Sequence, residues 1–305
     1  MDRTTLSFNI AFMAIFAVVL LVLLVVMTRP ASCYRRADAM SVRLRLPYGT
    51  AATRDVVAAR SRRGTTWALT AALIGLCAAV PFLATPLARE PYFLLIAVLP
   101  CIVLPTATAN VVINLRERLF HPAPDVPRIA RLTRMRSRDY LGSAGARVPW
   151  VLAGVLAFAL VAIIAVSTAA PGRLAPSAVS AFVAAAALTL CLHAARPFLD
   201  RLVLDRPQPA ADTLELAWDD AFRTETLRSL ALAACQLSGI AIGMGAIAIA
   251  PTATLWAAVA MQLPTWGAIV PQFVYVGWNG RPLQPALYPD WLRAPAGSAV
   301  EGSAA

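Results

Sequence analysis

The segment from Leu115 to Trp150 most constrains what this chain can fold into. It holds eight arginines against three carboxylates, whereas the apolar stretches beside it, residues 92–114 and 151–169, hold no charged residue. A segment with this much charge does not cross a bilayer core, and short arginine-rich loops mark the cytoplasmic face of a membrane. The segment therefore predicts membrane insertion and also the side on which the loops lie.

Composition supports the same fold class. Hydrophobic residues make up 59% of the 305 residues and charged residues only 14%, which is unlike a soluble globular protein. Because about 20 apolar residues span a bilayer as a helix, we predict an all-α, polytopic membrane protein with seven transmembrane helices. One membrane domain is expected over residues 1–293, with a disordered tail over residues 294–305. The predicted spans are residues 8–27, 67–85, 92–114, 151–169, 177–195, 229–250 and 252–278.

Arginine position predicts the orientation. Three basic segments, residues 29–65, 115–150 and 196–228, and the tail hold all but three of the 27 basic residues. The N-terminus is therefore expected outside and the C-terminus in the cytoplasm, in a bacterial plasma membrane. The net charge of +11 is explained by orientation, so no nucleic-acid partner is predicted. Anionic lipid headgroups are the expected contact of the basic segments.

The spacing of the spans suggests an internal repeat. Trp67 and Trp150 are 83 positions apart, and so are the Glu117-Arg118-Leu119 and Asp200-Arg201-Leu202 triplets. One interpretation is a threefold repeat of a basic loop plus a helical hairpin. Hairpins joined by loops of similar length give the same spacing without duplication, so both interpretations stay open.

Residues that carry chemistry are sparse. The five cysteines form no CxxC pair and there are only two histidines, so no catalytic residue, metal ligand or cofactor is predicted. No Asp, Glu or Arg falls within the core of a span, which disfavours ion-coupled transport. An enzyme acting on lipid is the least favoured class.

Two groups of side chains are candidates for a solute path. Asn110 and Asn114 share one helix face, and two prolines flanked by glutamines interrupt the last span. A path would run between the third and seventh spans, and interhelical hydrogen bonds and kinked packing helices are the alternatives. The candidate path residues are Asn110, Asn114, Gln262, Pro264, Pro271 and Gln272.

A second candidate is the helix predicted from Asp212 to Leu230. Asp212 with Glu215 matches a capping box, and Trp218 and Phe222 lie on one face. Asp219 and Asp220 make the polar side acidic, which disfavours contact with anionic lipid. The helix is expected to dock on the basic segments of its own chain or on a partner protein.

The lysine-free, alanine-rich spans and the LAWDDAFRTETLRSL stretch resemble uncharacterised multi-pass membrane proteins of high-G+C Gram-positive bacteria. This resemblance implies a membrane location and no activity. The favoured function is a non-enzymatic membrane subunit or accessory protein that engages a partner through its cytoplasmic loops. The alternative is a permease for a small neutral or apolar solute.

Overall fold

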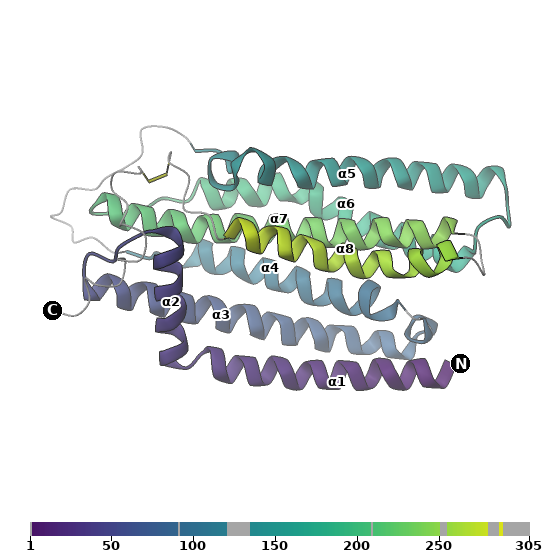
Figure 1. Cartoon of the computed structure of the whole chain (residues 1–305), viewed down its shortest axis with the longest axis horizontal. Helices are drawn as coiled ribbons and strands as arrows, with labels where there is room; N and C mark the ends of the chain where they lie inside the picture. Colours follow the sequence, from purple (N-terminus) through teal and green to yellow (C-terminus); the bar gives the residue numbers. More distant parts are fainter. Residues whose placement is uncertain are drawn as a thin grey trace.

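The computed structural model describes residues 2–90, 92–120, 135–208, 210–250, 255–279 and 287–288. Every regular element in these ranges is helical, which confirms the all-α class. Long helices lie side by side, and the short helix α2 crosses them at one end (Figure 1). The elements are α1 (Asp2–Met27), α2 (Pro30–Leu44), α3 (Ala51–Ala79), η1 (Val80–Ala84), η2 (Pro86–Arg89), η3 (Leu94–Val98), α4 (Leu99–Arg116), α5 (Ser137–Ala169), α6 (Pro176–Leu204), α7 (Thr213–Ile249) and α8 (Leu255–Asn279).

Six helices of the described part of the chain are long and apolar enough to cross a membrane. Apart from residues 85, 92, 93 and 250, they cover the first six predicted spans, as expected for a multi-pass membrane protein. The seventh predicted span falls in α8, which is not among the six. The seven-span count, the orientation and the repeat stay predictions, and the predicted disordered tail lies outside the described residues.

The basic segments were expected as loops, and this was wrong for much of their length. Residues 30–44 form α2, residues 51–66 begin α3, and α5 begins at Ser137. Arginine and alanine favour a helix in these segments. Local signals also set the ends, because Pro30 occupies the first turn of α2 and the Thr50 hydroxyl accepts a hydrogen bond from the Thr53 amide. The basic segments therefore extend the spans beyond the apolar stretches.

Helix α7 is the centre of the bundle. It packs against α4, α5, α6 and α8, and buried side chains occur along its whole length. The stretch from Asp212 to Leu230 is the continuous beginning of this helix rather than a separate surface helix. The other half of the bundle is built on α3, which packs against α1, α2 and α4.

Small residues let α7 and α8 approach closely. A Cβ atom added to Gly239 would lie 2.5 Å from the Gly267 carbonyl oxygen, and one added to Gly243 would lie 2.4 Å from the Pro264 nitrogen. The GxxxG pair formed by Gly239 and Gly243 is thus used for packing within the chain. Helix α8 continues through Pro264 and Pro271 without interruption.

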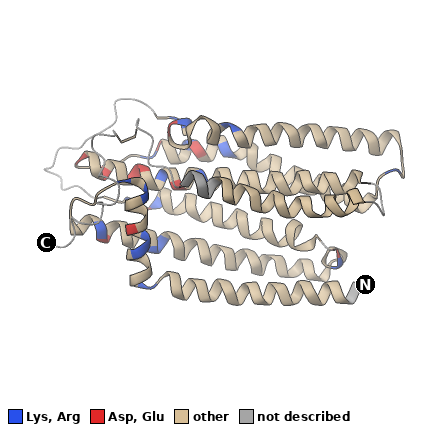
Figure 2. Ribbon diagram, viewed as in Figure 1, with Lys and Arg blue, Asp and Glu red and all other residues tan. Residues whose placement is uncertain are grey.

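Most charged residues lie at one end of the bundle (Figure 2). We call this the arginine-rich end. It is formed by α2, the starts of α3, α5 and α7, and the ends of α4 and α6. The rest of the long helices is almost free of charge, so the structure separates a charged layer from an apolar one.

Candidate binding site at the arginine-rich end

The capped start of α7 positions the predicted docking residues. The Asp212 carboxylate accepts a hydrogen bond from the Glu215 amide at 2.7 Å. The Glu215 carboxylate accepts one from the Ala211 amide, also at 2.7 Å. The predicted Asp212 cap is therefore confirmed, although Glu215 bonds one residue before the cap. Two satisfied amides fix where α7 begins and so which way its side chains point.

Trp218 and Phe222 are buried against other parts of the same chain. The Trp218 ring stacks on Tyr48 at 5.3 Å, and its Nε1 donates to the Pro47 carbonyl at 3.1 Å. The guanidinium of Arg60 lies 5.1 Å from the centre of the Phe222 ring. In these contacts the start of α7 docks on a basic segment of its own chain, which was one of the two expected alternatives. A partner that reached these side chains would first have to displace Tyr48 and Arg60.

Asp219 and Asp220 tie α7 to its neighbours. Asp219 accepts from Arg223 Nε at 3.0 Å, and Gln208 donates to both carboxylates at 2.9 and 2.8 Å. Asp220 also accepts from the Tyr140 hydroxyl of α5 at 3.0 Å. Removing one member of such a buried pair costs about 3–5 kcal/mol. These two acids therefore stabilise the packing of α5, α6 and α7 at this end.

Asn110 and Asn114 bond to neighbouring segments. Asn110 donates to the Ser229 hydroxyl of α7 at 3.0 Å. The buried Asn114 accepts from Arg206, which follows α6, through its carbonyl oxygen and its side chain. Both side chains therefore hydrogen-bond to a neighbouring part of the bundle, as in the alternative to a solute path.

The four path residues of α8 differ in their exposure. Gln262 and Gln272 are exposed on the surface of the chain, whereas Pro264 is buried against α7 and Pro271 is half-buried. A glutamine outside the predicted path bonds to the α8 backbone. The side-chain amide of Gln236 on α7 donates to the Ala268 carbonyl at 3.1 Å. That carbonyl lies beside the Gly267 carbonyl, which Pro271 leaves without its helical donor.

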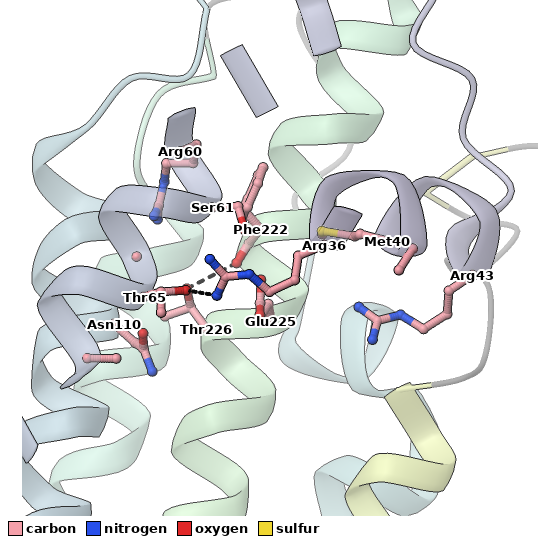
Figure 3. Close-up of a pocket in the computed structure, with 13 residues that line it drawn as sticks. Arg36, Met40, Arg43, Arg60, Ser61, Thr65, Asn110, Phe222, Glu225 and Thr226 are labelled. Atoms are coloured by element: carbon pink, nitrogen blue, oxygen red, sulfur yellow. Dashed lines mark hydrogen bonds between the residues drawn. The ribbon is translucent and has the colours of Figure 1, made fainter. Parts of the chain in front are cut away.

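A cavity of about 370 Å³ opens at the arginine-rich end between α2, α3, α4 and α7. It is lined by three arginines, Arg36, Arg43 and Arg60, and by one carboxylate, Glu225. Figure 3 shows Arg36 reaching from α2 toward Thr65 of α3, to which it hydrogen-bonds. Asn110 also lines this cavity, whereas none of the α8 residues 255–274, whose side chains the structure describes, does.

The three arginines are held to different degrees. Arg36 donates to the Met27 carbonyl at 2.6 Å, and buried Arg60 lies 3.6 Å from a Glu117 oxygen. Arg43 is exposed, and within the described residues it has no hydrogen bond or ion pair. The cavity therefore combines two fixed cations with one cation that is free to bind an anionic group.

The sequence did not single out this cavity. Arg36, Met40 and Arg43 follow a spacing of four and three residues, which places them along one helix face. That signal was present, but it has meaning only once residues 30–44 are taken as a helix. Among the described residues, no three His, Cys, Asp or Glu side chains come together as a metal-binding group. Comparison of the chain with models of known families, with curated proteins and with solved structures finds no match.

Proposed function

We propose that this chain is a non-enzymatic subunit of a membrane assembly in a bacterial plasma membrane. Its arginine-rich end would face the cytoplasm and bind an acidic segment of a partner protein at the cavity between α2, α3, α4 and α7. The orientation follows from the arginine excess at this end, which is the usual mark of the cytoplasmic side.

The free guanidinium of Arg43 is the observation that carries the proposal. Three arginines and a single carboxylate line the cavity, so its wall has excess positive charge. Arginine forms paired hydrogen bonds with carboxylates, and these are stronger than bonds between neutral groups. Arg36 and Arg60 are already fixed by their own chain, so little ordering is needed when an acidic side chain enters.

The interior of the bundle supports the same proposal. The Asn110 side chain is hydrogen-bonded to α7 and the Asn114 side chain to Arg206, and α8 packs with backbone contact on α7. Gln262 and Gln272 face away from the bundle. The permease alternative therefore has less support than a subunit whose function lies at its charged surface.

The test is purification in gentle detergent from the native membrane, followed by mass spectrometry of the proteins that remain bound. The Arg43→Glu variant should lose a stoichiometric partner. The matched control is Arg35→Glu, which makes the same charge change at an exposed site on α2 outside the cavity. The control should keep the partner, and added salt should weaken the complex. A wild-type protein that purifies alone, or a partner kept by both variants, refutes the proposal.

A further inference from the structure

A second cavity lies between the start of α5 and the end of α6, and its volume is about 710 Å³. Arg136, Ser137 and Trp150 line one side of it, and Arg196, Asp200 and Arg201 line the other. It shares no lining residue with the cavity that holds Arg43. Binding at this second cavity therefore does not depend on the proposed function.

The wall of this cavity contains an unsatisfied buried cation. Arg196 is only 2% exposed, and its Nε and Nη1 atoms have no hydrogen-bond partner among the described residues. The nearest carboxylate oxygen, on Asp200, is 3.8 Å from Nε, which is too long for a hydrogen bond. A buried donor without a partner is costly, and a charged one more so. Arg196 is therefore poised to bind an acceptor in the cavity.

The same wall contains an unsatisfied buried acceptor. One oxygen of Asp200 accepts a hydrogen bond from the Ser137 hydroxyl at 3.1 Å. The other oxygen, Oδ1, is buried and has no hydrogen-bond partner in the described structure. A ligand that satisfies both residues must therefore offer a strong acceptor to Arg196 and a strong donor to Asp200.

The charges around the cavity indicate what that ligand is. Arg136, Arg196 and Arg201 supply three guanidinium groups against two carboxylates, Asp200 and Asp205. Guanidinium groups bind phosphate through paired hydrogen bonds. The free Asp200 oxygen suits an ammonium group, which carries only donors. A molecule with a phosphate and a nearby ammonium satisfies both needs, whereas a phosphate alone leaves Asp200 Oδ1 unbonded.

The position of the cavity indicates that the ligand is a lipid. Two of its lining residues, Trp150 and Arg196, directly adjoin the uncharged stretches 151–169 and 177–195, and Trp150 is 50% exposed. Tryptophan is enriched at the level of lipid headgroups. Phe198, next to the lining residue Pro197, is 63% exposed, as expected for a side chain in contact with acyl chains. We propose that this cavity binds the headgroup of an ethanolamine phospholipid, with phosphate on the arginines and ammonium on Asp200.

Native mass spectrometry of the whole detergent-purified chain tests the proposal. The protein is given equal amounts of phosphatidylethanolamine, phosphatidylcholine and phosphatidylglycerol with identical acyl chains. The ethanolamine lipid should be retained best, because choline has no N–H donor and glycerol has no cation. Equal retention of the three lipids, or preference for phosphatidylglycerol, overturns the assignment.

Variants locate the binding. Arg196→Gln and Arg201→Gln should each reduce retention of the ethanolamine lipid about tenfold, the effect of losing one hydrogen bond to a charged group. Asp200→Asn should remove the preference over choline while phosphate binding remains. Arg138→Gln, an exposed change outside the cavity, is the control and should have no effect. Retention unchanged in exposed Arg201→Gln refutes the site even if the buried Arg196 variant fails to fold.

Soluble ligands distinguish the source of the phosphate. Free phosphoethanolamine and inorganic phosphate should compete with the lipid only weakly, because neither buries an acyl chain beside the cavity. Displacement of the lipid by phosphoethanolamine at equal concentration would show a site for a soluble metabolite and would overturn the lipid assignment.

Discussion

The close contact between α7 and α8 gives the most direct test of the packing. We expect Gly239→Ala to destabilise the protein. The added methyl group would lie 2.5 Å from the Gly267 carbonyl oxygen and 2.7 Å from its Cα atom. Ordinary van der Waals contact begins at 3.4 Å, so relief of the 2.5 Å contact requires α8 to move away by roughly 0.9 Å. Both neighbours are backbone atoms, which cannot rotate away as a side chain can.

The size of the effect follows from two losses. Forcing one extra methyl into a packed site costs about 1–3 kcal/mol. The same movement would stretch the bond from Gln236 to the Ala268 carbonyl, now 3.1 Å, beyond hydrogen-bond range. Such a bond is worth about 0.6 kcal/mol in a membrane. Alanine recovers about 0.8–1 kcal/mol of helix propensity over glycine, so the net loss is about 0.6–2.8 kcal/mol.

The assay is the free energy of unfolding in mixed detergent micelles, measured by titration with a denaturing detergent. Gly154→Ala is the matched control, because a Cβ atom at Gly154 of α5 meets no other atom within 4 Å. That variant should be as stable as the wild type or slightly more stable. If Gly239→Ala and Gly154→Ala have the same unfolding free energy, α8 does not pack closely on α7.

Three further predictions concern the arginine-rich end and the orientation. Arg223→Met should lower the unfolding free energy by about 3–5 kcal/mol, because it leaves Asp219 buried without its ion pair. Titration with a denaturing detergent measures this loss, and a loss below about 1 kcal/mol contradicts the prediction. Burial and the neighbouring Asp38 raise the pKa of Tyr48 above its ordinary 10.0. The contribution of Tyr48 to the unfolding free energy should therefore be fully present below pH 10 and be lost as the pH rises further. In the Tyr48→Phe variant, the unfolding free energy should fall less steeply above pH 10. A cysteine placed at Arg173 should react with an impermeant maleimide in whole cells and one at Arg35 only after permeabilisation, and the opposite pattern would invert the predicted topology.

The membrane class and the first six spans could be predicted because both depend on local composition. A run of apolar residues is read one residue at a time, and its length alone decides whether it reaches across a bilayer. The capped start of α7 was equally local, since Asp212 and Glu215 lie three positions apart.

The environment of the candidate residues could not be predicted, because it depends on contacts far apart in sequence. The pattern placed Trp218 and Phe222 on one face of a helix, but nothing in that pattern names what covers the face. Trp218 bonds to Pro47, which is 171 positions away. Arginines pose the same difficulty, since exposed Arg43 and buried Arg196 contribute equally to a count of charges. Only the fold separates a cation that orients the chain from one that is poised to bind a ligand.

The central place of α7 has a consequence for how the protein is made. Helices of a multi-pass protein enter the bilayer one by one and pack together afterwards. Helices α4, α5 and α6 each pack against α7, yet all three precede it in the chain. His193 of α6 and Asn110 of α4 have partners, Ser238 and Ser229, that are synthesised only with α7. The side chains of His193 and Asn110 therefore lack these hydrogen-bond partners until α7 has been inserted. A chaperone or insertase that shields polar groups in the membrane would act in that interval.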